Sequence, residues 1–316
     1  MSGSPSALTA RDLAAVTLVI LLWGLNFVPT KFALQDFTPF QLGAARFLLA
    51  AFPLVLFLPR PPIPLKWLLL YGLTQGVGQF GFLFLALNIG MTTALASVVM
   101  QTQIFFTALM GATLLGEVIS RPLKAGMIVA GVGLVCFAVN AIMASGTEEV
   151  GMIGLMLTLL AAGMWASANI LVRKIQSSGR QYRPLALLAW SSLISAIGFI
   201  VLAALLDDAE VRWQWLQAKP STWISVLYLG WVASGVAFLL WTLLLTRHPA
   251  SRVAPFSLGI PVVGLLAGVF ILKEQVTALQ WLGSALVMSA LVLVISSALY
   301  SAHNLKRRYE KMANKQ

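Results

Sequence analysis

The sequence predicts an all-α integral membrane protein with ten transmembrane helices, arranged as two inverted five-helix repeats. Hydrophobic residues make up 59% of the 316 residues and charged residues only 10%, whereas a soluble domain is about 45–50% apolar and about 25% charged. A membrane-spanning helix needs about 20 mostly apolar residues. Ten such segments occur, at residues 13–34, 38–58, 66–88, 92–115, 122–143, 151–173, 184–206, 221–246, 251–272 and 278–300.

Basic residues indicate how these segments cross the membrane. Of the 21 Lys and Arg, Lys31 and Arg46 lie within segments. With the N-terminus inside, only Arg212, Lys219 and Lys273 lie on the outer side, which leaves 16 on the inner side. Lys and Arg concentrate in short cytoplasmic loops of membrane proteins. Both termini are therefore expected in the cytoplasm, with the basic tail touching anionic lipid.

The two halves of the chain contain a similar segment. "LASVVMQTQIFFTALMGATLLGE" and "RVAPFSLGIPVVGLLAGVFILKE" align without a gap at an offset of 157 residues, so that Glu117 aligns with Glu274. Five spans separate the two segments, so they cross the membrane in opposite directions. We expect an N-terminal repeat, 1–146, and a C-terminal repeat with the basic tail, 147–316. Inverted repeats are typical of secondary transporters, whose substrate site lies near the midplane between the halves.

Glutamines inside the spans are candidates for that substrate site. Gln101 and Gln103 lie near the middle of the fourth span, and Gln75 and Gln79 lie four residues apart on one face of the third. Such amides can also serve only to hold helices together. Two polar stripes on neighbouring spans favour a cavity wall, and Gln101 most of all.

An arginine and two prolines are further candidates. Arg46 lies about 10 Å into the second span, where a charge marks a pathway or a specific partner. It would hold a substrate carboxylate or cap the carbonyls of a broken helix. Pro255 and Pro261 each remove a backbone donor from the ninth span. They either kink that helix for packing or expose backbone groups to a substrate.

Asparagines and tryptophans complete the candidates. Asn26 and Asn169 each precede a lysine by five residues, in matching places of the two halves. Trp23, Trp165 and Trp190 lie too deep for the aromatic belt at a membrane surface, which leaves core packing and cavity lining equally open. The candidate substrate-binding residues are Gln101, Gln103, Gln75, Gln79, Asn26, Trp23, Arg46, Trp165, Asn169, Trp190, Pro255 and Pro261.

The acidic residues bear on energy coupling. Glu117 and Glu274 follow the fourth and ninth spans, and an anion is favourable at the start of a helix. We expect these two residues to cap the fifth and tenth spans. No Asp, Glu or His falls within the ten segments, although proton-coupled carriers usually keep such groups there. This pattern favours facilitated diffusion or exchange, or coupling at an acid on the membrane rim.

Motifs of other function classes are absent or misplaced. "GVGQFG", residues 76–81, matches a dinucleotide-binding pattern but lies inside a span without a preceding strand. No Gly-Lys-Ser/Thr loop for ATP occurs, and no His-Glu-x-x-His motif. The net charge of +11 follows the topology and forms no patch for nucleic acid. We therefore expect no enzyme activity, no cofactor and no metal site.

Four segments resemble the drug/metabolite transporter superfamily, in its EamA-type ten-helix branch: "WGLNFVPTK", "ASVVMQTQIFFTALMGATLLGE", "RVAPFSLGIPVVGLLAGVFILKE" and "WLGSALVMSALVL". The likeness covers about residues 13–300. It implies two five-helix repeats, both termini inside, and efflux of small metabolites. Many family members have a proline early in the fourth span. The "QTQ" at that place is similar to members that export O-acetylserine and cysteine.

These observations predict a secondary transporter of the bacterial inner (plasma) membrane. It would export small amino-acid-type metabolites, such as O-acetylserine or cysteine, by alternating access. A drug or other metabolite exporter of the same superfamily is the alternative, although acids would then be expected in the cavity. An intramembrane enzyme is a distant alternative, since it would need a nucleophile or an acid pair. The expected partners are a small-molecule metabolite and the lipid bilayer, with the chain acting as a monomer or homodimer.

Overall fold

The computed structural model describes residues 9–143, 148–248 and 250–313, and these residues form helices and connections without a strand. In the described chain, nine segments are long and apolar enough to cross a membrane. A shorter apolar helix at Pro255–Phe270 takes the place of the ninth predicted span. The all-α membrane prediction is confirmed. The nine segments are Ala10–Ala33, Pro39–Phe57, Leu65–Asn88, Thr93–Leu115, Arg121–Met143, Gly151–Ser177, Pro184–Leu206, Pro220–Arg247 and Ala278–Ser297.

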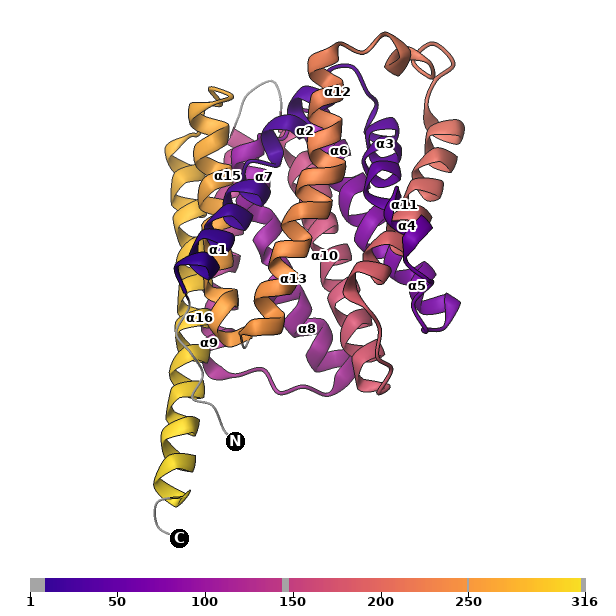
Figure 1. Ribbon diagram of the computed structural model, residues 1–316. Helices are drawn as coiled ribbons and strands as arrows, with labels where there is room; N and C mark the ends of the chain where they lie inside the picture. The colour runs from indigo at the N-terminus through magenta and orange to yellow at the C-terminus, as the bar shows by residue number, and fades with distance from the viewer. Residues whose placement is uncertain (1–8, 144–147, 249, 314–316) are drawn as a thin grey trace.

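Short interruptions divide several of these segments into separate elements (Figure 1). The first half contains α1 (Ala10–Gly24), α2 (Phe27–Ala33), α3 (Pro39–Ala51), α4 (Leu54–Phe57), α5 (Leu65–Tyr71), η1 (Gly72–Gly78), α6 (Gln79–Asn88), α7 (Thr93–Val99), η2 (Met100–Thr102), α8 (Gln103–Leu115) and α9 (Arg121–Met143). The second half contains α10 (Glu148–Ser177), α11 (Pro184–Leu206), η3 (Gln214–Gln217), α12 (Pro220–Leu227), η4 (Tyr228–Val236), α13 (Ala237–Arg247), α14 (Ala250–Val253), η5 (Ala254–Leu258), α15 (Gly259–Phe270) and α16 (Ala278–Ala313).

Two of the interruptions are π-helical and lie at equivalent places in the third and eighth spans. A π turn leaves carbonyl groups without their usual helical donor. The carbonyl of Gly72 in η1 accepts a hydrogen bond from the Ser195 hydroxyl of α11 at 2.9 Å. The carbonyl of Ala233 in η4 accepts one from the Trp23 indole of α1, also at 2.9 Å. Side chains of neighbouring helices therefore stabilise both irregular segments.

The ninth span is broken where its prolines predict a break. Ala250–Val253 is one helical turn, η5 is a 3-10 segment that contains Pro255, and α15 continues from Gly259. Pro255 supplies no backbone donor, which favours such a change of helix type. The carbonyl of Pro261 accepts a hydrogen bond from the Ser97 hydroxyl of α7 at 3.4 Å. This hydrogen bond joins the ninth span to the fourth.

The helix contacts of the two halves correspond. In the first pair, α1 packs on α13 and its counterpart α10 packs on α6; in the second, α1 packs on α15 and α10 packs on α8. Three further large contacts join a span to its counterpart in the other half: α3 with α11, α7 with α15, and α9 with α16. This arrangement is the one expected of two five-helix repeats, although their boundary at residues 146 and 147 stays a prediction.

Glu274 connects the two halves at one end of the bundle. Its carboxylate accepts hydrogen bonds from the backbone N–H groups of Thr93 at 2.8 Å and Ala94 at 2.9 Å, at the start of α7. The start of α16 is capped by Thr277, whose hydroxyl oxygen accepts a bond from the N–H of Gln280 at 3.2 Å. The prediction that Glu274 caps the tenth span is therefore wrong. Close packing of α15 on α7 carries the carboxylate to the fourth span instead.

The opposite end of the bundle carries the α8–α9 connection and the far end of α16, whereas α2, η3 and the start of α12 lie with Glu274 (Figure 1). By the charge distribution, the α8–α9 end is the one predicted to face the cytoplasm. We call it the α8–α9 end below.

Candidate functional site

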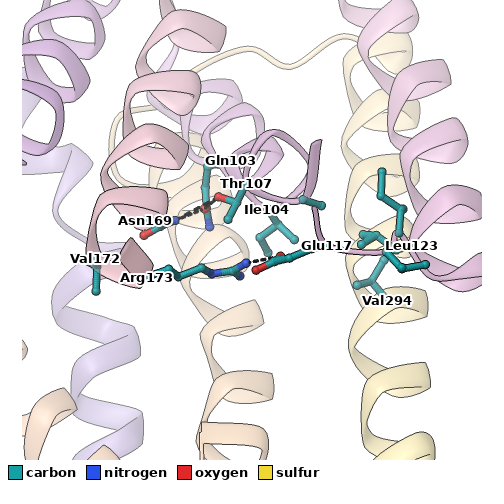
Figure 2. Close-up of a pocket in the computed structure, with 12 residues that line it drawn as sticks. Gln103, Ile104, Thr107, Glu117, Leu123, Asn169, Val172, Arg173 and Val294 are labelled. Atoms are coloured by element: carbon teal, nitrogen blue, oxygen red, sulfur yellow. Dashed lines mark hydrogen bonds and ion pairs between the residues drawn. The ribbon is translucent and has the colours of Figure 1, made fainter. Parts of the chain in front are cut away.

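A cavity of about 500 Å³ lies between α8, α9, α10 and α16 at the α8–α9 end (Figure 2). Sites for small molecules commonly have about 300–1,000 Å³. The polar side chains that line it are Gln103, Thr107, Glu117, Asn169 and Arg173. Apolar residues complete the wall, among them Ile104, Leu123, Val172 and Val294.

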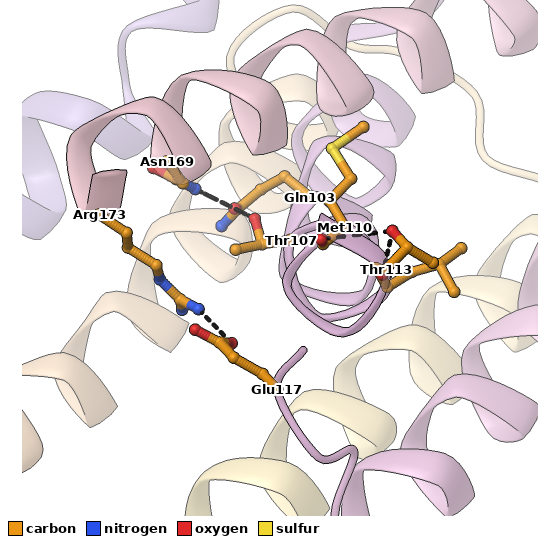
Figure 3. A network of polar contacts seen from close by, with 8 residues as sticks. Gln103, Thr107, Met110, Thr113, Glu117, Asn169 and Arg173 are labelled. Carbon is orange, nitrogen blue, oxygen red and sulfur yellow. Dashed lines mark hydrogen bonds and ion pairs between the residues drawn. The ribbon is translucent and has the colours of Figure 1, made fainter. Parts of the chain in front are cut away.

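Three of the polar residues form a hydrogen-bonded network across the cavity (Figure 3). The amide nitrogen of Asn169 donates to the side-chain oxygen of Gln103 at 3.0 Å and to the hydroxyl oxygen of Thr107 at 3.2 Å. Gln103 and Thr107 lie four residues apart and so share one face of α8. Asn169 reaches them from α10. Mutual hydrogen bonds hold the three side chains in fixed positions on the wall.

An ion pair lies one helical turn from this network. The guanidinium of Arg173 donates to the carboxylate of Glu117 at 2.7 Å, and each side chain is 46% exposed. Arg173 follows Asn169 by four residues on α10. Glu117 follows Gly116, whose left-handed backbone (φ 69°) ends α8, and its side chain points toward α10 (Figure 2). The prediction that Glu117 caps the fifth span is therefore wrong, because the neighbouring helix offers it a cation.

Arg46 lies outside this cavity and is almost fully buried, at 4% exposure. Its guanidinium carbon lies 4.2 Å from the ring centroid of Phe80, and Nη1 donates to the side-chain oxygen of Asn26 at a long 3.4 Å. A guanidinium over an aromatic face is a favourable cation–π arrangement. The partners of Arg46 in the described chain are thus the rings of Phe80 and, at 5.9 Å, Phe47, together with a side-chain amide. Roles for Arg46 and Asn26 toward a substrate stay predictions.

The two glutamines of the third span contact each other. The amide nitrogen of Gln75 donates to the side-chain oxygen of Gln79 at 2.9 Å. Gln79 is buried. Gln101 lies in η2, the 3-10 turn that precedes Gln103, and is partly buried. None of these three glutamines is among the residues that line the cavity.

The predicted tryptophans pack within the bundle. Trp23 reaches the carbonyl of η4, as described above, and its ring centroid lies 5.6 Å from that of Trp241. Trp190 donates to the carbonyl of Leu58 at 3.0 Å. Trp165 packs against the largest buried cluster. Of the candidates predicted from the sequence, the structure brings only Gln103 and Asn169 together in the cavity.

Two polar residues of the cavity wall, Thr107 and Arg173, are not among the candidates predicted from the sequence. Thr107 lies one turn after Gln103, and this spacing on one helix face was the signal that could have found it. In the sequence alone, Arg173 is one of the basic residues that indicate the cytoplasmic side. Its place four residues after Asn169 becomes informative once α10 is known to pack on α8. Glu117 was singled out, but for helix capping.

A buried acid changes one expectation about energy coupling. α1 begins at Ala10, so Asp12 lies in the first turn of an apolar segment and is only 5% exposed. Its carboxylate lies 3.0 Å from Nε2 of His248, which directly follows α13. The expectation that no acid falls within a span is therefore wrong. The first span starts three residues earlier than predicted because Thr9 and Asp12 form a capping box.

The profile of the EamA-like transporter family matches residues 12–139 and again residues 152–296. A crystal structure of another protein superposes with a TM-score of 0.61 at 20% sequence identity, covering 91% of this chain and 96% of that chain. That similarity concerns the fold.

Two similar proteins carry a functional description. A protein of Escherichia coli (strain K12), described as a probable amino-acid metabolite efflux pump, is 41% identical over 287 residues, which is 90% of this chain and 94% of the relative. A protein of Salmonella typhimurium with the same description is 39% identical over 285 residues, with the same coverage of 90% and 94%. With these matches and the double profile match, the chain belongs to the EamA-like transporter family.

Proposed function

We propose that this transporter exports small amino-acid-type metabolites from the cytoplasm across the bacterial inner membrane. The observation that carries the proposal is the composition of the cavity. It combines one carboxylate, one guanidinium, two amides and a hydroxyl with apolar side chains. Such a wall suits a small molecule that bears both charges and a short side chain. The descriptions of the two bacterial relatives support the same substrate class.

The asymmetry of the bundle supports export by alternating access. The cavity lies at the α8–α9 end, which we expect to face the cytoplasm. At the other end α15 packs closely on α7, and a Cβ at Gly264 would lie only 2.6 Å from Cβ of Ser97. We infer that the molecule is in its inward-facing state. Release of substrate then requires the two five-helix repeats to rock until the α7–α15 contact opens.

The energy source is a separate part of the proposal. We propose exchange or facilitated diffusion, because the cavity wall contains no acid other than the Arg173-paired Glu117 among the described residues. The Asp12–His248 pair is the first candidate for coupling if transport responds to a pH gradient. Both side chains are buried, and they lie together at the start of the first span.

Counterflow in proteoliposomes tests the proposal. The purified transporter would be reconstituted with labelled O-acetylserine, cysteine and a panel of amino acids, with and without an imposed pH gradient. We expect saturable flux of at least one of these compounds, equal in both conditions. Flux of none of them would refute the substrate class. Flux that follows the gradient would refute exchange and would direct attention to Asp12→Asn and His248→Gln variants.

A further inference from the structure

The ion pair between Glu117 and Arg173 is unusually placed for a purely structural contact. It joins the end of α8 to α10 at 2.7 Å, at the mouth of the cavity, and both side chains are 46% exposed. An ion pair this exposed contributes little to the stability of a fold, because water screens the two charges. The same exposure means that a ligand can separate the two groups at small cost.

The surroundings keep the two charged groups directed at each other. The carboxylate of Glu117 lies against Gly111 of α8, where a Cβ would be only 2.5 Å from Oε2. The glycine therefore leaves the space in which the carboxylate lies, on the side that faces α10. Arg173 extends from α10 into the same space (Figure 3). Gly111 and the helices α8 and α10 thus position the two charged groups at the mouth of the cavity.

A free amino acid is the ligand whose charges match this pair. A guanidinium offers two parallel N–H groups, which fit the two oxygens of a carboxylate. A carboxylate accepts charge-assisted hydrogen bonds from an ammonium group. We propose that Arg173 binds the α-carboxylate and Glu117 binds the α-ammonium group of an amino acid that enters between them. The inference rests on the proposed function, whose substrate recognition it specifies.

The arrangement also assigns a place to the substrate side chain. With its charged groups held at the mouth, the side chain points one turn deeper, about 6 Å, toward Gln103, Thr107 and Asn169. These residues offer hydrogen bonds to a short polar group, and Ile104 and Val172 contact its carbon atoms. The α-groups would thus define the substrate class, while the deeper network would select among side chains.

Direct binding tests the inference independently of transport. Thermal stabilisation of the detergent-purified protein would be measured with O-acetyl-L-serine, L-cysteine and L-serine, and with L-serinamide and N-acetyl-L-serine. Serinamide lacks the carboxylate, and N-acetylserine lacks the ammonium group. Loss of one hydrogen bond to a charged group weakens binding at least about tenfold. The wild type is expected to prefer L-serine to both analogues by at least that factor.

Variants separate ligand binding from a structural role. Arg173→Gln should abolish the preference over serinamide, and Glu117→Gln the preference over N-acetylserine, while Arg173→Lys should retain part of the first. Lys174→Gln is the matched control. It removes the adjacent positive charge, which lies over the Trp67 ring outside the cavity, and both preferences should remain.

Three results would overturn the inference: no binding of any of the three amino acids, no preference over the analogues in the wild type, or an equal loss for all compounds in the variants. Amino-acid binding with these preferences but without counterflow would instead refute the proposed export and leave the binding site standing.

Discussion

At the scale of single residues, the polar side chains of the spans differ in how fully their hydrogen-bonding groups are paired. Gln103, Thr107 and Asn169 satisfy one another across the cavity, whereas Arg46 leaves its Nε buried without a hydrogen-bond partner. The sequence could identify Gln103 and Asn169, because an amide in a span is rare and has few uses. It could not separate them from Gln101 or Gln75, because composition carries no information on which helices face each other.

The Thr107 hydroxyl offers a matched test of the cavity wall. Thr107→Val removes a hydroxyl that accepts a bond from Asn169 while preserving side-chain shape. We expect transport of amino acids to fall about tenfold at unchanged protein levels, because a partner of the substrate network is lost. Thr113→Val removes an equivalent hydroxyl from the exposed face of α8. Equal flux in the two variants, measured by counterflow, would contradict a role for Thr107.

Asp36 offers a pH-dependent test outside the spans. Its carboxylate accepts hydrogen bonds from the Thr222 hydroxyl and from the backbone N–H of Lys219, and these bonds lower its pKa below the usual 3.8. Because the folded pKa is depressed, the charged form stabilises the protein above pH 4, and this contribution is lost as the pH falls through the folded pKa.

Asp36→Asn should therefore lower the melting temperature by at least about 2 °C at neutral pH. The difference from the wild type should shrink as the pH falls below about 4. The exposed Asp208 serves as the control, and Asp208→Asn should match the wild type. A difference that stays constant across this pH range would contradict the assigned role of Asp36.

At the scale of elements, most spans could be predicted because length and proline placement fix them. The predicted span 184–206 has the same bounds as α11, which begins with Pro184 at its first turn. The π-helical segments could not be predicted. They depend on Ser195 and Trp23, which lie on other helices and supply the donors that the irregular turns need. Local sequence carries no signal of such partners.

Gly111 and Gly268 occupy equivalent places in the fourth and ninth spans, and replacing each with Ala tests whether their surroundings differ in packing. A Cβ at Gly268 would lie 2.8 Å from the backbone nitrogen and from Cβ of Ala94. Gly268→Ala is therefore expected to destabilise the protein by about 1–3 kcal/mol, as overpacking does. The atoms nearest to a Cβ at Gly111 would be those of the flexible carboxylate of Glu117. Gly111→Ala should cost clearly less, as thermal unfolding in detergent would measure. Equal costs would contradict a closed α7–α15 contact.

At the scale of the whole molecule, the inverted repeat connects fold and function. The segment of the ninth span ends in Glu274 at the closed α7–α15 contact, whereas the related segment of the fourth span ends in Glu117 at the open cavity. Two related segments thus occupy two different environments in a single conformation, as alternating access requires. The repeat could be read from the offset of 157 residues, but the direction of the asymmetry could not, because both conformations are compatible with one sequence.

We propose that amino-acid-type substrates enter the cavity between α8 and α10 from the cytoplasmic side. Such entry is tested most directly by replacing Cys136, the single cysteine, with Ser and introducing Ala108→Cys in the cavity wall. We predict that a membrane-impermeant maleimide labels this cysteine in inside-out vesicles and that O-acetylserine or other transported amino acids slow the labelling. Labelling from the opposite face only, or at a rate that these compounds leave unchanged, would contradict the account.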